Sequence, residues 1–116
     1  VEALAKVQTD DGMWRTLLVD PTSYVESSAT AGFAYGILKA VRKGYIPEKY
    51  RETAWKAVNA VISRIGEDGM VGNVSYGTIA ADNLEYYKKV AQCPMPYGQS
   101  MTLLMLVESL KHPEAQ

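Results

Sequence analysis

The sequence predicts an all-α fold built from stacked helical hairpins, and two observations support this prediction. Apolar residues recur with helical spacing in several segments of the 116-residue chain, whereas few segments alternate in the way that strands do. The triplet Asp-Gly-Met occurs twice, with Gly12 and Gly69 57 residues apart, and each copy follows a helical segment and precedes a polar loop. Repeated units of helix, loop and helix stack into arcs or closed rings.

Composition limits the classes of function. Hydrophobic residues make up 47% of the chain and charged residues 22%, which predicts a single folded domain over residues 1–116. The net charge is −1 and no basic run is present, so we expect neither nucleic acid nor a membrane as partner. The single cysteine, Cys93, excludes an intrachain disulfide and a zinc site of paired cysteines. No apolar run approaches the roughly 20 residues that span a bilayer.

The first predicted helical segment is "EALAKVQ", in which Leu4 and Val7 read as the last turns of a helix. Neither an initiator methionine nor a signal peptide precedes it. We therefore expect either that the chain was cut from something longer or that its true start lies outside this sequence.

The next two predicted helices form an antiparallel hairpin. The segment "SSATAGFAYGILKAVRKG" carries apolar residues on one face, with Ser27 or Ser28 as its N-cap and Gly44 at its end. After the short turn "GYIP", a second helix is predicted from Pro47 to Ile65, where Gly66 ends it.

Two further helices are predicted after the second Asp-Gly-Met loop. In "DNLEYYKKVAQ", Asp82 as N-cap and Glu85 three residues later have the spacing of a capping box. The segment "GQSMTLLMLVESLKH" is apolar on nearly every side, so we expect neighbours to enclose it, and we interpret His112 as a charge at its C-terminal end. Between the predicted helix that ends at Ile65 and the one that begins at Asp82, "MVGNVSYGTI" is compatible with a small β-hairpin.

Several separated motifs occur in the order of a known family. The run "QTDDGMWRTLLVDPTSYVESSATAGFAYGILKAVRKGYI", followed by "EDGMVGNVSYGT", "DNLEYY" and "MPYGQSMTLLMLVESL", resembles the C-terminal portion of glycoside hydrolase family 105, the unsaturated rhamnogalacturonyl hydrolases. The resemblance covers essentially the whole chain. It implies a partial (α/α)6 barrel or toroid, of which this chain supplies the last few helices.

The resemblance also implies an activity. Enzymes of the family remove the C4=C5-unsaturated galacturonyl group that a lyase leaves on a rhamnogalacturonan (pectin) fragment. An aspartate protonates the enol ether at C4, water adds at C5, and the resulting hemiketal collapses. The implied partner is an oligosaccharide, and neither a metal nor an organic cofactor is implied. The usual glycoside hydrolysis uses a pair of carboxylates instead.

The family's general acid, together with a Trp-x-Arg-Gly-x-x-Trp motif that cradles the sugar, belongs to the N-terminal half of the barrel, and neither occurs in these 116 residues. The aspartates present have structural interpretations in turns or caps: Asp10, Asp11, Asp20, Asp68 and Asp82. We therefore assign no catalytic residue and expect the chain alone to be inactive.

Two candidates for substrate binding follow the first glycine turn. Trp14 could stack on an apolar sugar face or cover the end of the core, and the sequence leaves both interpretations open. Arg15 could pair with a uronate carboxylate through its planar fork, or it could be a solvated surface residue.

The other candidates lie at predicted helix N-termini. Tyr24, Glu26 and Ser28 stand where backbone donors converge, so they could hold a polar ligand, and capping is the alternative. Tyr97 and Gln99 in "PYGQS" are similar candidates.

A second class of function remains open, namely a stand-alone helical interaction module or an inactive truncated remnant. A partial barrel leaves apolar helix faces uncovered, so we expect a homo-oligomer or a complementing N-terminal half as partner. A third alternative is another α/α-toroid enzyme that acts on a different unsaturated uronide. We expect a cytoplasmic location, because the disaccharides on which such an enzyme would act are imported into the cell and because the chain lacks disulfides.

Overall fold

A computed structural model describes residues 1–112 of the chain, and within this part all regular secondary structure is helical, which confirms the predicted all-α class. The helices are α1 (Glu2–Val7), α2 (Ser27–Arg42), α3 (Tyr50–Ile62), α4 (Leu84–Lys88) and α5 (Pro96–Ser109). None of the described helices is long and apolar enough to cross a membrane.

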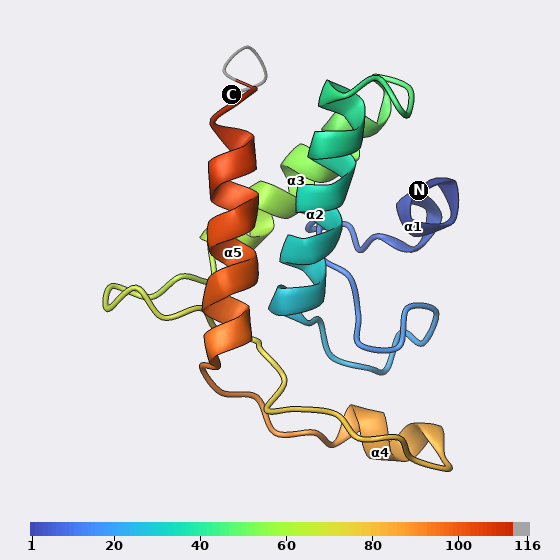
Figure 1. Cartoon of the computed structure of the whole chain (residues 1–116). Helices are drawn as coiled ribbons and strands as arrows, with labels where there is room; N and C mark the ends of the chain where they lie inside the picture. The colour runs from blue at the N-terminus through green and yellow to red at the C-terminus, as the bar shows by residue number, and fades with distance from the viewer. Residues whose placement is uncertain (113–116) are drawn as a thin grey trace.

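Helices α2 and α5 stand side by side with their N-termini at the same end of the molecule, and α3 runs behind them (Figure 1). The approach of α2 to α5 is close, because a Cβ on Gly32 would lie 2.6 Å from Cε of Met101. α2 and α3 form the predicted helical hairpin. The core lies between these helices and the loop after α1, and its larger residues are Met13, Trp14, Ile37, Leu38, Val41, Val58, Val61, Val71, Val74 and Met105.

The two Asp-Gly-Met loops have the same backbone hydrogen bonds. In the first, the N–H of Thr9 donates to the carbonyl of Met13 and that of Gly12 donates to Thr9, both at 2.9 Å. In the second, Gly66 donates to Met70 and Gly69 donates to Gly66, also at 2.9 Å. Gly12 and Gly69 adopt φ angles of 98° and 82°, in the left-handed region that glycine tolerates best. The repeated triplet is therefore a repeated turn.

The repeat extends from each turn to the helix that follows it. The N–H of Trp14 donates to Oγ1 of Thr30 at 3.0 Å, and the N–H of Val71 donates to Oε1 of Gln99 at 2.7 Å. Thr30 and Gln99 each lie four residues after an N-cap, which is Glu26 in α2 and Met95 in α5. α5 is thus the repeat equivalent of α2, with a shift of 69 residues between the N-caps.

The caps of two helices differ from the predicted ones. Glu26, rather than Ser27 or Ser28, caps α2, because its extended backbone lets the carboxylate accept from the N–H of Ala29. The hydroxyl of Ser27 donates instead to the carbonyl of Gly72 at 2.6 Å.

In α4 the cap is Asn83, not Asp82, and its side chain accepts from the N–H of Tyr86 at 3.0 Å. α3 begins at Tyr50, three residues after Pro47, because the intervening residues form a turn in which the N–H of Tyr50 donates to the carbonyl of Pro47.

Two predictions about packing were wrong. The segment 70–79 forms no hairpin with itself, because Val71 bridges to Ile65 and Ser75 bridges to Gln92. The neighbours of α5 do not enclose it within residues 1–112, since one face packs on α2 while the opposite side leaves four apolar side chains exposed: Leu103, Leu104, Val107 and Leu110.

The C-terminal ends of α2 and α5 meet in a buried polar cluster. Nε2 of His112 lies 2.9 Å from Oε2 of Glu108, and Nδ1 of His112 contacts Arg51. Arg42 donates to both oxygens of Glu108. His112 is 1% exposed, so it is a buried member of this cluster rather than a surface residue at the end of α5.

Candidate functional site

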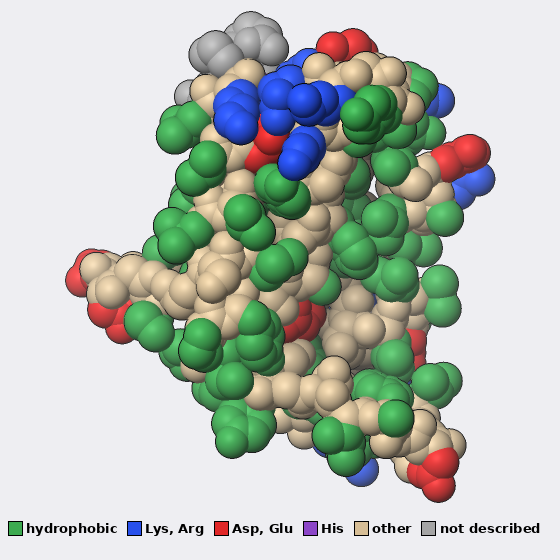
Figure 2. Space-filling model, viewed as in Figure 1, with side chains coloured by type: hydrophobic (Ala, Val, Ile, Leu, Met, Phe, Trp, Pro, Cys, Tyr) green, Lys and Arg blue, Asp and Glu red, His purple; other side chains and the backbone are tan. Residues whose placement is uncertain are grey.

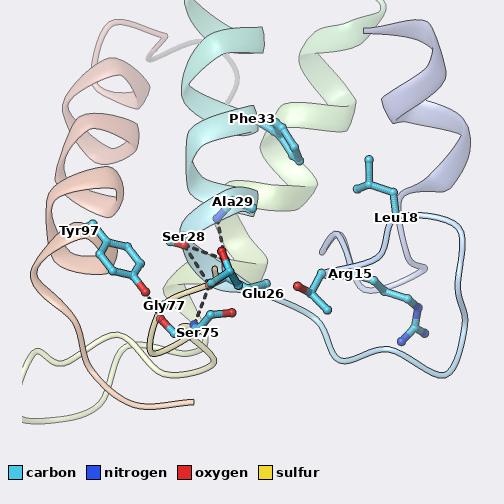
Figure 3. Close-up of a pocket in the computed structure, with 11 residues that line it drawn as sticks. Arg15, Leu18, Glu26, Ser28, Ala29, Phe33, Ser75, Gly77 and Tyr97 are labelled. Carbon is cyan, nitrogen blue, oxygen red and sulfur yellow. Dashed lines mark hydrogen bonds between the residues drawn. The ribbon is translucent and has the colours of Figure 1, made fainter. Parts of the chain in front are cut away.

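The principal pocket lies at the N-terminal ends of α2 and α5 and has a volume of about 490 Å³ (Figure 3). The loop after α1 supplies one side, the first turns of α2 supply the centre, and the segment that follows the second Asp-Gly-Met loop supplies the other side together with α5. Its lining comprises Arg15, Thr16, Leu18, Glu26, Ser28, Ala29, Phe33, Ser75, Gly77, Thr78 and Tyr97.

Four of the six predicted binding residues line this pocket, namely Arg15, Glu26, Ser28 and Tyr97. Tyr97 and Arg15 lie on opposite sides, with Glu26 and Ser28 between them (Figure 3). The pocket thus brings together residues that are up to 82 positions apart in the sequence. Trp14 and Tyr24 are not part of the lining. Gln99, the weaker candidate, instead holds the second glycine loop through Val71 and Gly69.

Trp14 belongs to the core. Its side chain is fully buried, and its Nε1–H donates to the carbonyl of Leu4 at 2.9 Å. Phe33 packs edge-on against it, with ring centroids 5.4 Å apart, and it is Phe33 that presents a ring to the pocket. The interpretation of Trp14 as a sugar-stacking residue is therefore corrected to that of a core residue that supports Phe33.

Glu26 is 5% exposed, and both oxygens of its carboxylate accept hydrogen bonds. Oε1 accepts from the N–H of Ala29 at 2.7 Å, Oε2 accepts from the N–H of Ser75 at 2.8 Å, and the hydroxyl of Ser28 reaches both oxygens. Its position at the helix N-terminus also favours a negative charge. Among the described lining residues Glu26 is the sole carboxylate, so the pocket does not offer the acid pair of ordinary glycoside hydrolysis.

Ser75 was not predicted, yet it forms a hydrogen-bonded junction in the pocket wall. Its N–H donates to Glu26, its carbonyl accepts from the hydroxyl of Tyr97, and its Oγ lies 2.5 Å from the hydroxyl of Tyr24. Burial, followed by the nearby charge of Glu26, raises the pKa of Tyr97. Tyr24 thus reaches the pocket indirectly, through Ser75.

The sequence contains a weak signal for this junction. Asn73 and Gly77, two turn-forming residues that flank Ser75, adopt positive φ angles of 61° and 152°. They indicate irregular backbone, in which side chains rather than a strand ladder must satisfy polar groups. The pocket residues that sequence reasoning missed are Thr16, Leu18, Phe33, Ser75, Gly77 and Thr78.

Arg15 differs from the other arginines in having no carboxylate partner among the described residues. Its Nη1 donates to the carbonyl of Ser23 at 2.6 Å, and it forms no ion pair with any residue of the described chain. Arg42 pairs with Glu108, Arg51 with Glu48 and Arg64 with Asp11. The Arg15 guanidinium points away from Glu26 (Figure 3).

A neighbouring pocket of about 480 Å³ shares two residues, Arg15 and Leu18, with the principal one. Its other lining residues are Lys6, Val7, Gln8, Thr9, Asp10, Val19 and Pro21. The two pockets therefore adjoin, with Arg15 at their boundary.

Three aspartates outside the principal pocket, Asp11, Asp20 and Asp68, are held by hydrogen bonds within the protein, whereas Asp82 is not the predicted helix cap. Asp11 accepts from Arg64 at 3.0 Å, and Asp68 accepts from the N–H of Met70. The hydroxyl and N–H of Thr22 donate to Asp20 and, with Lys88, hold the pKa of Asp20 at about 2. Within residues 1–112 no group of three or more potential metal-ligating side chains converges.

Comparison with known proteins gives matches that extend over nearly the whole chain. Residues 1–112 match the sequence profile of Glycosyl Hydrolase Family 88. The chain is 37% identical over 112 residues to the unsaturated rhamnogalacturonyl hydrolase YesR of Bacillus subtilis (strain 168), a match that covers 96% of this chain and 31% of YesR.

Two solved structures are also similar. A possible member of the GH105 family from Salmonella enterica serovar Paratyphi A matches with a TM-score of 0.94 and 48% identity, over 96% of this chain and 29% of that one. The family 105 glycoside hydrolase of C. acetobutylicum matches with a TM-score of 0.79 and 27% identity, over 95% of this chain and 35% of that one. The chain spans about a third of the length of these relatives.

Proposed function

Because the chain belongs to Glycosyl Hydrolase Family 88, we propose that it forms one sector of a hydrolase that removes unsaturated galacturonyl groups from rhamnogalacturonan fragments. The similarity to YesR and to structures of family 105 confirms the resemblance found in the sequence. In the proposed reaction a proton adds at C4 of the enol ether, water adds at C5, and the hemiketal opens to release the remaining sugar.

The observation that carries this proposal is Arg15, a guanidinium at the edge of a pocket without a carboxylate partner among the described residues. A guanidinium presents a planar fork of donors that matches a carboxylate. The unsaturated galacturonyl group carries such a carboxylate. We therefore propose that Arg15 binds it.

The rest of the pocket suits a sugar ring. Phe33 and Leu18 provide apolar surface for a ring face, while Thr16, Ser28 and Thr78 carry hydroxyls for hydrogen bonds to the sugar. The adjoining pocket beyond Arg15 extends the site in a direction that the next sugar of an oligosaccharide can follow.

The proton in this scheme comes from outside the chain. Glu26, the carboxylate of the principal pocket, already accepts hydrogen bonds from Ala29, Ser28 and Ser75, so its oxygens face donors. We propose that an aspartate in the remainder of the barrel supplies the proton, and that the chain alone binds the sugar without hydrolysing it.

The exposed face of α5 supports a barrel that extends beyond this chain. With the 69-residue shift between N-caps, Leu103, Leu104, Val107 and Leu110 are equivalent to Ala34, Tyr35, Leu38 and Val41 of α2. In α2 these positions are buried or half-buried, and α3 packs on that helix. Figure 2 shows hydrophobic side chains along the length of α5. We propose that a helix of the complementing half covers them, and that a second copy does so when this half is absent.

The oligomeric state of the isolated chain in solution tests whether a second copy covers the exposed face of α5. We expect a concentration-dependent dimer by light scattering, and we expect Val107→Asp to make it monomeric, because Val107 is 55% exposed at the centre of the face. Val19→Asp is the matched control, since Val19 is the same residue type and is 83% exposed but lies off this face. A wild-type chain that stays monomeric at high concentration would contradict the proposed association.

Binding of a defined sugar tests the proposed function itself. An unsaturated galacturonyl-rhamnose disaccharide is titrated into the wild-type chain and into two variants, Arg15→Ala and Arg15→Lys, and its affinity is measured by calorimetry. The control variant is Lys43→Ala, which removes an exposed charge outside the pocket. Loss of the fork should weaken binding by about tenfold or more in Arg15→Ala and less in Arg15→Lys. Equal affinity in wild type and Arg15→Ala, or no binding by the wild type, would overturn the proposal.

A further inference from the structure

We infer that Glu26 and Tyr97 act as positioning residues, which clamp the backbone of Ser75 and thereby set the position of the pocket wall at residues 75–78. The identity of the ligand rests on the proposed function, whereas the clamp itself is a property of the chain without ligand. The sequence analysis gave both residues as candidates for direct substrate contact, with helix capping as the alternative.

The clamp joins three parts of the chain at a single residue. Glu26 is the N-cap of α2, Tyr97 lies in the first turn of α5, and Tyr24 lies in the loop before α2. These three side chains satisfy the N–H, the carbonyl and the hydroxyl of Ser75, in that order. Ser75 is 6% exposed, so water does not offer these groups an equivalent set of partners.

The wall beyond Ser75 has little support of its own. The N–H of Tyr76 donates to the carbonyl of Ala91 at 2.7 Å, but Gly77 and Thr78 have no hydrogen bond to any described residue. Gly77 also has the conformational freedom of a glycine, and a Cβ there would meet nothing within 4 Å. The position of Gly77 and Thr78 in the pocket therefore depends on how firmly the residues just before them are held.

The geometry separates the two roles that Glu26 and Tyr97 could play. Both oxygens of Glu26 are occupied by donors of the protein, and the hydroxyl of Tyr97 is directed to the carbonyl of Ser75 (Figure 3). A sugar in the pocket would meet Thr78 and the ring of Tyr97 before it could compete for these polar groups. Their effect on affinity and on the choice of sugar ring is therefore transmitted through Ser75.

Hydrogen exchange on the ligand-free chain tests the clamp directly. Tyr97→Phe keeps the ring but removes the hydroxyl that donates to Ser75, and Glu26→Gln replaces one acceptor oxygen of the carboxylate with a donor. In both variants we expect the amides of Ser75 and Tyr76, which donate to Glu26 and to the carbonyl of Ala91, to exchange about tenfold faster or more, while the amides of α2 and α5 keep their rates. Tyr86→Phe is the matched control, because this tyrosine lies outside the pocket.

Affinity for the same disaccharide gives the second measurement. If both residues act through Ser75, the double variant should lose little more affinity than the weaker-binding single variant, whereas two independent contacts would lose affinity additively. Arg15→Ala should weaken binding with no change in exchange at the amides of Ser75 and Tyr76. Failure of the proposed function would remove binding from every variant and leave the exchange result intact.

Two results would overturn the inference. One is unchanged exchange at the amides of Ser75 and Tyr76 in Tyr97→Phe, and the other is additive loss of affinity in the double variant. If Glu26→Gln fails to fold, Tyr97→Phe alone decides through its exchange rates, because it removes one hydroxyl and leaves the N-cap of α2 in place.

Discussion

The guanidinium of Arg42 forms two hydrogen bonds to the carboxylate of Glu108, from Nε at 2.7 Å and from Nη2 at 2.9 Å. The pair joins the C-terminal end of α2 to that of α5, at the opposite end of these helices from the pocket. The side chain of Glu108 is 2% exposed, and His112 contacts the same carboxylate. The parallel arrangement of the two helices is therefore fixed at both ends, by Ser75 at one and by Glu108 at the other.

This pair predicts how stability depends on acid. The hydrogen bonds from Arg42 hold the pKa of Glu108 at about 2, below its ordinary value of 4.5. A lowered folded-state pKa contributes stability that is fully present above pH 4.5 and is lost as the pH falls toward 2. Glu108→Gln should cost about 3 kcal/mol at neutral pH, because it leaves a cation without its buried partner. The difference from wild type should shrink between pH 4.5 and 2, as measured by urea unfolding.

Glu48→Gln is the control for this experiment. Glu48 also pairs with an arginine, Arg51, which lowers the pKa of Glu48, but its side chain is 74% exposed. Its removal should change the unfolding free energy much less than Glu108→Gln. A difference between Glu108→Gln and wild type that stays constant from pH 7 to pH 2 would show that Glu108 is not the titrating group.

The two equivalent glycines offer a matched pair of substitutions. Gly12 and Gly69 share a turn and a positive φ, so alanine should strain both by about 1 kcal/mol. They differ in surroundings, since a Cβ on Gly12 would lie 2.5 Å from the carbonyl oxygen of Lys56 and one on Gly69 would meet nothing within 4 Å. Gly12→Ala should therefore destabilise the chain by about 3 kcal/mol or more, and Gly69→Ala by about 1 kcal/mol. Equal losses in thermal unfolding would contradict this explanation.

Helices could be predicted where local spacing decides the structure. Ala31, Ala34, Leu38 and Val41 share the buried side of α2, and their recurrence every three or four residues is visible in the sequence. The cap of α2 was not predicted, because glutamate is not a preferred N-cap and its choice depends on Ser75, 49 residues away. The exposure of Leu104 and Val107 was not predicted either, because a helix that is apolar on nearly every side gives no indication of which side its neighbours leave uncovered.

Only part of the candidate site could be predicted, because local sequence determines some of its residues and tertiary packing determines the others. Arg15 and Tyr97 could be found because polar or aromatic residues beside glycine turns and helix starts are visible locally. Trp14 lies in the core and Phe33 lines the pocket. The sequence does not determine which of the two faces the core, because this depends on how the loop after α1 packs against α2. Ser75 carries no sequence motif, and its importance arises from three side chains that only the tertiary structure brings together.

The two repeat units differ in length at one place. Gly12 precedes the N-cap Glu26 by 14 residues, whereas Gly69 precedes the N-cap Met95 by 26, and the longer connection contains Ser75, Thr78 and α4. Despite this difference, both turns keep the same backbone hydrogen bonds, and from each turn a backbone N–H donates to the side chain four residues after the N-cap of the next long helix. An insertion into this connection can therefore change the specificity of the pocket without disturbing the helical scaffold that the two units share.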